Sequence, residues 1–300
     1  MNKIHRKILN ILDAEVICEY KNAESPVSES LIFHNHDGYE IYLFLGGNVN
    51  YYTESSGKKL ERGDLILTGP YAFHGSVMIH SGQYDRIVIN IRESAFRSLC
   101  SRKTNLAECF LRTPPSELNL LCLNEDDIRS FTETARSLQA ELRKHSWGDD
   151  IMVRALLQQC LVMINRRVVS GQPPEYPGIM PDFLAETFSY IDKHLCEEIT
   201  LQQLANHVHH NETYLSRCFK NISGTSPYQY ILAKRITLAQ QLLREGHSPN
   251  DASELSGFHN YSNFSRFFSK QTGCSPRQYQ SLIRQNQQSF SSDQDKSPEA

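Results

Sequence analysis

An internal repeat in the C-terminal third of the chain restricts the possible folds more than any other feature. Residues 211–230 and 260–279 align without a gap at an offset of 49, with 9 identical residues in 20 positions. The shared residues are Asn, Ser-Arg, Phe, Gly, Ser-Pro and Gln-Tyr, in that order. A solenoid needs about three repeats or more to bury its faces, so two copies do not make one. The repeat therefore predicts a tandem pair of similar binding units.

The first copy has the pattern of a short helix, a turn and a second helix. Thr200 and Gln203 are spaced as a capping box, and Asn211 can cap the helix that follows. Apolar residues recur on this second helix at helical spacing, and we expect them to be buried: Leu215, Cys218, Phe219 and Ile222. The outer face then carries small polar and basic side chains: Thr213, Ser216, Arg217 and Lys220. A helix-turn-helix inserts such a second helix into the major groove of DNA.

The second copy repeats this arrangement. Ser248, Pro249 and Asp251 suit a helix start, and the later helix is expected to bury three phenylalanines, Phe264, Phe267 and Phe268. Polar residues at its start and on its outer face are candidate DNA contacts: Asn260, Ser262, Asn263 and Arg266. A lone arginine on a helix is most often a solvated surface residue. Because Arg217 and Arg266 occupy the same position of the repeat, we favour a binding role for both.

The segment between the copies predicts a rigid spacer. Ser226 and Pro227 can open a helix that runs to about Arg244 and stops near Gly246. Eighteen residues give a helix of roughly 27 Å, close to the roughly 34 Å between successive major-groove segments. Residues 213–284 hold nine Lys and Arg against three Asp and Glu, whereas the whole chain has a net charge of -3. The basic surface expected of a DNA-binding protein is therefore local.

The stretch from about Phe188 to Tyr279 resembles the double helix-turn-helix domain of AraC/XylS-type bacterial transcription regulators. The motifs that carry the resemblance are ITLQQLA, YLSRCFK, GTSPYQYI, KRITLAQQLL and SGFHNYSNFSRFFSKQTGCSPRQY. It implies that six side chains face bases, namely Thr213, Ser216, Arg217, Ser262, Asn263 and Arg266, and that Lys220 lies nearer to phosphate. The chain departs from the family's usual residues at four positions: His210, Asn211, Ser253 and Ser269.

The N-terminal half has a different pattern. Between Ser30 and Ile91, short runs rich in Ile, Val, Tyr and Phe alternate with turn residues, which is typical of a β-barrel or β-sandwich. Helical spacing follows after Glu93, and residues 171–181 hold four prolines and two glycines, which indicates a linker. We therefore expect a two-domain α+β fold. Its parts would be a β-barrel region with appended helices at 1–170, the linker at 171–181, a helical DNA-binding domain at 182–286 and a disordered tail at 287–300.

Histidines in the β-rich half suggest a ligand site. The spacing of His34, His36, Glu40 and Gly47 resembles the first cupin motif, and Gly63, Gly69-Pro70 and His74 resemble part of the second. In metal cupins, three His and one Glu bind a divalent transition metal. Sensor domains of the resembled family commonly keep the barrel without a metal, so we favour an effector site and expect no cofactor. The candidate effector residues are His34, His36, Tyr39, Glu40, Tyr42 and His74.

The favoured interpretation is a non-enzymatic, sequence-specific transcription regulator controlled by a small effector such as a sugar. Its expected partners are double-stranded DNA, the effector, a second copy of the chain and, for an activator, RNA polymerase. The apolar face from Ile151 to Val168 is a candidate dimer surface, unless this helix packs on its own barrel. Two alternatives remain, a cupin metalloenzyme fused to a helical module and a protein-binding scaffold. With no apolar run of 18 residues and no signal sequence, we expect a soluble cytoplasmic chain.

Overall fold

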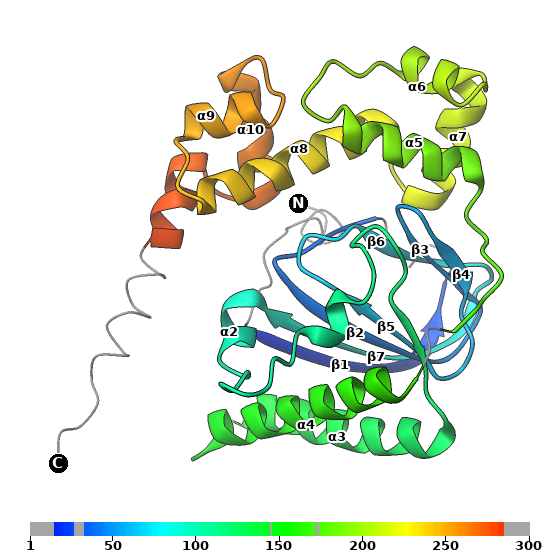
Figure 1. Ribbon diagram of the computed structural model, residues 1–300, viewed down its shortest axis with the longest axis vertical. Helices are drawn as coiled ribbons and strands as arrows, with labels where there is room; N and C mark the ends of the chain where they lie inside the picture. Colours follow the sequence, from blue (N-terminus) through cyan, green and yellow to red (C-terminus); the bar gives the residue numbers. More distant parts are fainter. Residues whose placement is uncertain (1–14, 27–32, 145, 172–173, 285–300) are drawn as a thin grey trace. The chain divides into compact units, whose positions relative to one another are not determined.

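The computed structural model of the 300-residue chain describes residues 15–26, 33–144, 146–171 and 174–284 (Figure 1). The described residues divide into two compact units. One unit is formed by the described residues of Ile11–Ser189 together with Arg217–Thr225. The other combines Tyr190–Ser216 with the described chain from Ser226 onward. The first unit is built on β-sheet and the second on helices, so the expected two-domain α+β fold is confirmed. The expected tail at 287–300 lies outside the described residues.

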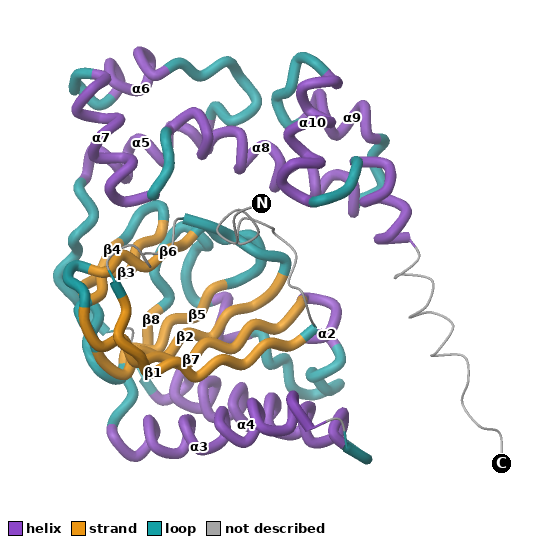
Figure 2. The backbone as a smooth tube through the Cα atoms, turned by 180° about the vertical axis from the view of Figure 1, so that it is seen from behind, coloured by secondary structure: helices purple, strands orange, loops and turns teal. Residues whose placement is uncertain are grey.

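The β-sheet unit contains two antiparallel sheets, shown as orange strands in Figure 2. Among the described residues the larger sheet has the strand order β1-β7-β2-β5-β8 and the smaller β4-β3-β6. The strands are β1 (Val16–Ser25), β2 (Gly38–Gly46), β3 (Val49–Thr53), β4 (Gly57–Lys59), β5 (Asp64–Thr68), β6 (His74–Met78), β7 (Gly82–Arg92) and β8 (Leu120–Cys122). The runs at 40–45, 48–53, 64–68 and 86–91 are thus strands as predicted. Residues 31 and 32 of another predicted run lie outside the described residues.

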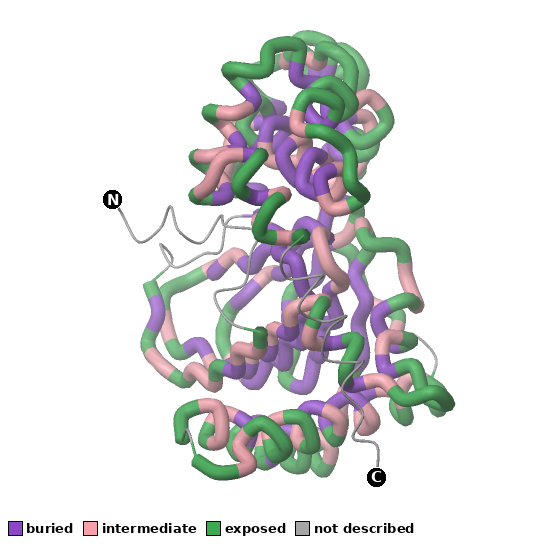
Figure 3. The backbone as a smooth tube through the Cα atoms, turned by 90° about the vertical axis from the view of Figure 1, so that its left-hand side faces the viewer, coloured by how far each residue is buried: buried purple, intermediate pink, exposed green. Residues whose placement is uncertain are grey.

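The central strand β2 separates two cores because side chains along a strand alternate between its faces. Ile41, Leu43 and Leu45 pack in the cluster that also receives the helices, whereas Tyr42 and Phe44 pack in a second cluster with residues of β3 and β5. The helices of this unit are α2 (Glu93–Arg97), the 3-10 helix η2 (Glu108–Leu111), α3 (Glu125–Lys144) and α4 (Asp149–Ser170). Figure 3 shows the strands largely buried, and α3 and α4 exposed on the side away from them.

Helix α4 packs on the larger sheet of its own unit, so its apolar face is not free as a whole. Leu157, Cys160, Leu161 and Ile164 are buried in the cluster shared with β2 and β7. Near the start of the helix, Ile151 is instead 66 % exposed. Of the two interpretations of this helix, packing on its own barrel holds for its central residues. Leu157 and Leu161 are therefore excluded as contacts with another chain.

The segment after α4 lies along the smaller sheet. The backbone N–H of Ile179 donates to the carbonyl oxygen of Gly57 at 2.9 Å, and Tyr176 packs against the second cluster. The proline residues of this segment leave it without helix, as expected, while residues 172–173 lie outside the described part. The expected domain boundary at 171–181 remains a prediction.

The C-terminal part of the chain is helical to the end of the described residues. Its helices are α5 (Asp182–Lys193), α6 (Leu201–His207), α7 (Glu212–Ser223), α8 (Pro227–Arg244), α9 (Pro249–Leu255) and α10 (Tyr261–Thr272). Both α9 and α10 pack on α8 (Figure 1). No helix in the described part of the chain combines the length and apolar character needed to cross a membrane.

Candidate functional site

The two copies of the repeat fold in the same way, residue by residue. Asn211 and Asn260 precede α7 and α10, and each side-chain oxygen accepts a hydrogen bond from the backbone N–H three residues later, at 2.8 and 2.9 Å. At the other end of the helices, the hydroxyl groups of Ser223 and Thr272 donate to the carbonyl oxygens of Phe219 and Phe268. The sequence repeat is therefore a structural repeat, including its helix caps.

A tight turn precedes each repeated helix. The turn contains one residue in the left-handed region, His209 with φ 55° in the first copy and Gly257 with φ 84° in the second. In both turns, the next residue donates its backbone N–H to a carbonyl oxygen five residues earlier, His210 to Ala205 and Phe258 to Ser253. These bonds close a short helix against the next one, so each copy is a helix-turn-helix, with α7 and α10 as the second helices.

The helices α7 and α10 bury one face and expose the other. Leu215, Phe219, Phe264 and Phe268 are fully buried. Cys218, Ile222 and Phe267 are only partly buried, so the expectation of a buried Phe267 holds in part. The candidate DNA contacts on the opposite face are exposed, apart from Ser216, which is half-buried: Thr213, Arg217, Lys220, Asn260, Ser262, Asn263 and Arg266.

Two of these candidates in α10 contact each other. The Arg266 guanidinium donates to the side-chain oxygen of Asn263 at 3.3 Å and lies 5.5 Å from the centre of the Phe267 ring. These contacts hold the guanidinium against the outer face of the helix. Asn260 uses its side-chain oxygen for the helix cap, so its amide nitrogen is the group left for another contact.

The spacer α8 has the length and ends predicted from the sequence. Ser226 caps it, Pro227 occupies its first turn, and the chain turns at Gly246 with φ 98°. Arg235 on α8 donates hydrogen bonds to the carbonyl oxygens of Leu195 and Glu197, in the loop before α6. This contact lies within the helical unit. It was not predicted, because nothing in the sequence pattern distinguishes Arg235 from a solvated arginine.

Gly257 joins the two copies of the repeat. A Cβ atom at this position would lie 2.8 Å from Cα of Cys196, 3.0 Å from the carbonyl oxygen of Leu195 and 3.0 Å from Nε of Arg235. The Cys196 thiol also donates to the carbonyl oxygen of Leu255 at 3.1 Å. The turn between α9 and α10 therefore packs directly against the loop between α5 and α6, and both are tied to α8.

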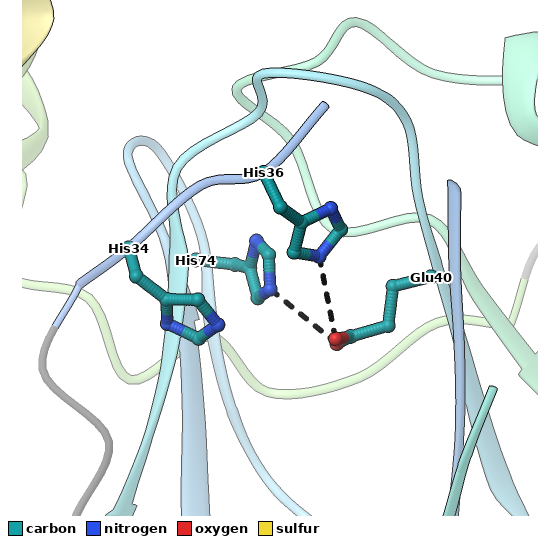
Figure 4. Close-up of side chains that lie close together, drawn as sticks. All are labelled: His34, His36, Glu40 and His74. Atoms are coloured by element: carbon teal, nitrogen blue, oxygen red, sulfur yellow. Dashed lines mark ion pairs between the residues drawn. The ribbon is translucent and has the colours of Figure 1, made fainter. Parts of the chain in front are cut away.

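In the β-sheet unit, the four predicted histidine and glutamate side chains gather in one cluster (Figure 4). His34 and His36 come from the segment before β2, Glu40 from β2 and His74 from β6. One donor atom from each of the four lies within 4.8 Å of the other three. Backbone hydrogen bonds in both directions between His34 and His74, each 3.0 Å long, fix this approach. The spacing in the sequence thus predicted residues that come together in space.

Two of these histidines have a defined orientation. Nδ1 of His36 lies 2.9 Å from the carbonyl oxygen of Gly38, and Nδ1 of His74 lies 2.9 Å from that of Ala72. A carbonyl oxygen only accepts, so each Nδ1 carries the proton and donates. The Nε2 atoms then point at Glu40, with Nε2–Oε distances of 3.4 Å for His36 and 3.3 Å for His74.

The cluster favours an ionised Glu40. Burial opposes the charge, but the adjacent His74 and His36 rings outweigh it and hold the pKa of the Glu40 carboxyl well below its usual range. Burial is the largest single influence on His74 and disfavours its charge, but the Glu40 carboxylate and the Ala72 carbonyl group together outweigh burial and raise the pKa of that imidazole. The site therefore keeps an anionic oxygen among imidazole nitrogens.

Of the two predicted tyrosines, Tyr42 lies on the same face of β2 as Glu40, next to Tyr51, and Tyr39 lies on the other face. Tyr42 is buried in the second core, where its hydroxyl lies 2.5 Å from that of Tyr84. Tyr39 is on the opposite face of β2 and packs against Phe96 and Phe110, with ring centres 4.1 and 4.7 Å away. The alternation of a strand explains this separation, because residues 39 and 40 point to opposite faces.

A cavity of about 190 Å³ lies at the ends of β2, β3 and β5. Tyr39 is the one predicted effector residue that lines it. Its other walls include Thr53, Thr68, Phe73, Phe110, Thr113, Glu117 and Asn119. Thr53 lies opposite His74 and Thr68 opposite Glu40 in the strand register, so the cavity borders the cluster. The walls from residues 110–119 come from the end of η2 and the loop that follows it, which have no recognisable sequence pattern, so they were not predicted.

Comparison with known proteins agrees with both halves of this description. The family described as AraC-like ligand binding domain matches residues 24–161, and that described as helix-turn-helix domain matches residues 204–281. The chain is 25% identical over 272 residues to "Probable transcriptional regulator LumQ" of Photobacterium leiognathi, covering 86% of this chain and 95% of that protein. It is 38% identical over 98 residues to "Uncharacterized HTH-type transcriptional regulator YobQ" of Bacillus subtilis, covering 32% of this chain and 41% of that protein. The solved structure of ToxT from Vibrio cholerae is 16% identical with a TM-score of 0.38, covering 90% of this chain and 99% of that one.

The paired helix-turn-helix units and the matched families define a DNA-binding transcription regulator that carries a ligand-binding domain. The chain belongs to the AraC family of these regulators.

Proposed function

We propose that one chain reads two successive major-groove segments on one face of a DNA duplex, with α7 in one and α10 in the other. The observation that carries this proposal is the repetition of the two helix-turn-helix units, which exposes Arg217 and Arg266 at equivalent positions. The α8 spacer of 18 residues is roughly 27 Å long, which suits neighbouring major-groove segments. We also assign base contacts to Thr213, Ser216, Ser262 and Asn263. Asn260, at the start of α10, is assigned a DNA contact through its amide nitrogen, and Lys220 a contact with phosphate.

Alanine variants of Arg217, Arg266 and Lys220 distinguish contacts with bases from contacts with phosphate. Arg217→Ala and Arg266→Ala should each weaken binding to a specific site by roughly 5- to 150-fold and relax base preference at one position. Lys220→Ala should weaken binding to all sequences alike and lower the salt slope by about one. Fluorescence anisotropy on specific and random duplexes at several salt concentrations measures both. Equal losses on specific and random DNA would contradict the assignment of the arginines to bases.

The effector site belongs to the cavity bordered by Tyr39, Thr53, Thr68 and Asn119. Its walls combine aromatic rings with hydroxyl and amide groups, which suits a small effector that carries hydroxyl groups, such as a sugar. The walls Thr53 and Thr68 are the cross-strand neighbours of His74 and Glu40, so the cluster of His34, His36, Glu40 and His74 would lie behind this cavity, with Tyr42 supporting it from the core. The chain has no proposed catalytic role, in keeping with relatives named as transcriptional regulators. A cytoplasmic regulator that activates transcription would also contact RNA polymerase.

A homodimer would place two DNA-binding units on one site, which can raise the effective affinity by about 10² to 10⁴ without any new contact. Leu157 and Leu161 are buried in the chain's own core, so the contact has to use other residues. Sedimentation of the full chain over a range of concentrations should show a dimer. A chain that remains monomeric both alone and on operator DNA would contradict this part of the proposal.

A further inference from the structure

Two buried nitrogen atoms in the β-sheet unit have no hydrogen-bond partner. Nε2 of His36 and Nε2 of His74 are both inaccessible to water, in side chains that are 5% and 1% exposed as residues. Buried polar atoms are nearly always hydrogen-bonded, so two such atoms side by side require an explanation. Their rings cannot supply it by turning over, because each Nδ1–H already donates to a backbone carbonyl oxygen.

The Glu40 carboxylate is the only charged group placed against both nitrogens in the described part of the chain, but it lies too far for strong hydrogen bonds. Charge-assisted N–H to O contacts are typically about 2.7–2.9 Å long. The Nε2–Oε separations here are 3.4 and 3.3 Å. The nitrogens face different oxygens of the carboxylate, Oε2 for His36 and Oε1 for His74, and one donor atom from each of the four side chains lies within 4.8 Å of the other three. The donors therefore gather around a common centre, close enough for small side-chain movements to bring them onto one ion.

The donors also have the chemistry of one class of ion. Imidazole nitrogen together with one carboxylate oxygen suits zinc and neighbouring transition metals, whereas calcium and magnesium prefer oxygen alone. Backbone carbonyl oxygens that accept from Nδ1–H are the usual means by which proteins orient histidine ligands. In Figure 4 the rings of His36 and His74 converge on Glu40, and His34 lies beside His74. The ring centres of His34 and His74 are 4.4 Å apart.

We propose that His36, Glu40 and His74, with His34 as a fourth donor, bind one divalent first-row transition metal ion in the sensor unit. The ion would satisfy both unpartnered nitrogens and would compensate the charge of a carboxylate that is only 6% exposed. It would also lie beside the cavity, since Thr53 and Thr68 are the cross-strand neighbours of His74 and Glu40. This reverses the expectation from the sequence, in which the four residues act without a metal.

Metal titration of the full, untagged chain tests the proposal. After treatment with a chelator, the protein should bind Zn²⁺ with a stoichiometry of about one ion per chain in isothermal titration calorimetry. Glu40→Gln keeps the size of the side chain but removes the anionic oxygen, and His74→Gln removes a nitrogen ligand. Each should lower the Zn²⁺ affinity by at least about 100-fold, since even groups that only orient ligands contribute about 10- to 100-fold. His80→Gln, an exposed histidine of the same unit, is the matched control and should leave the affinity unchanged.

A second measurement uses the unmodified chain, in case a variant fails to fold. X-ray absorption spectroscopy of the Zn²⁺-loaded chain should show nitrogen and oxygen neighbours at about 2.0–2.1 Å, together with the outer scattering of coordinated imidazole rings. Co²⁺ in place of Zn²⁺ should give the intense visible absorption of a tetrahedral site. Absence of stoichiometric binding, or bound Zn²⁺ without imidazole neighbours, would overturn the proposal. Neither result affects DNA recognition, which the arginine variants test separately.

Discussion

A DNA site with about half a helical turn, roughly 5 base pairs, inserted between its two half-contacts is expected to lose tight binding. The insertion turns one half-contact to the opposite face of the duplex. Helix α8 is continuous from Pro227 to Arg244, and Arg235 and Gly257 tie it to the neighbouring loops, so the spacer between the two recognition helices should not follow the change. One recognition helix would then remain engaged. The expected loss is on the order of 10²-fold or more, because specific binding exceeds non-specific binding by about 10³ to 10⁷.

The experiment begins with a site selected from the organism's own genome and mapped by footprinting. A gel-shift series then compares the original site with insertions of about 5 and about 10 base pairs. A full turn restores the face of the duplex but roughly doubles the distance between the half-contacts, which exceeds the reach of an 18-residue helix of roughly 27 Å. Both insertions should therefore weaken binding. Recovery at the full turn would indicate flexibly joined units, and indifference to both would contradict two-groove binding.

Gly257→Ala is expected to destabilise the helical part of the protein by roughly 2 to 5 kcal/mol. A left-handed backbone with φ 84° costs an L-residue roughly 1–2 kcal/mol. The new methyl group would also meet backbone atoms of Leu195 and Cys196 at 3.0 and 2.8 Å, and overpacking of this kind costs typically about 1–3 kcal/mol. Because this contact joins the two helix-turn-helix units, DNA affinity should fall together with stability.

Gly273→Ala is the matched control for this change. Gly273 has φ 78°, nearly the same backbone conformation, and nothing lies within 4 Å of a Cβ atom placed there. Its substitution should cost only the backbone strain. Denaturant unfolding followed by circular dichroism gives both free energies of unfolding. If the two substitutions have equal effects, the close approach of Gly257 to the loop at 195–196 contributes nothing.

The helical half was predictable down to individual helix caps, because the residues that signal a cap lie close together in the sequence. Thr200 with Gln203 and Ser248 with Asp251 form the predicted capping boxes, and Ser226 caps the predicted spacer. Each of these signals depends on residues three positions apart, which a single sequence displays directly. The contacts that join the units, such as Gly257 against Cys196, depend on residues about 60 positions apart, and no local pattern reports them.

The ligand site was predictable only in part, for a similar reason. The spacing of His34, His36 and Glu40 reflects one chain segment entering one strand, and His74 was found through its resemblance to a second motif. Tyr39 was grouped with Glu40 from proximity in sequence, although the strand period places them on opposite faces. The cavity walls contributed by residues 110–119 come from the end of η2 and the loop after it, which only the tertiary structure brings to the strand ends.

Strand β1 lies at the end of the larger sheet and was not predicted from the sequence. It pairs with β7 over ten residues at the end of the larger sheet, and it escaped prediction because its sequence mixes Glu19, Lys21 and Glu24 with apolar residues. An edge strand offers unpaired backbone groups to strands of other molecules, and charged side chains are a common protection against such pairing. The charged residues that obscure this strand in a pattern search are thus of the kind that disfavours edge-to-edge pairing of copies where β1 ends the sheet of described residues. Replacing Glu19 and Glu24 with valine would make the strand easy to recognise in the sequence and would favour aggregation.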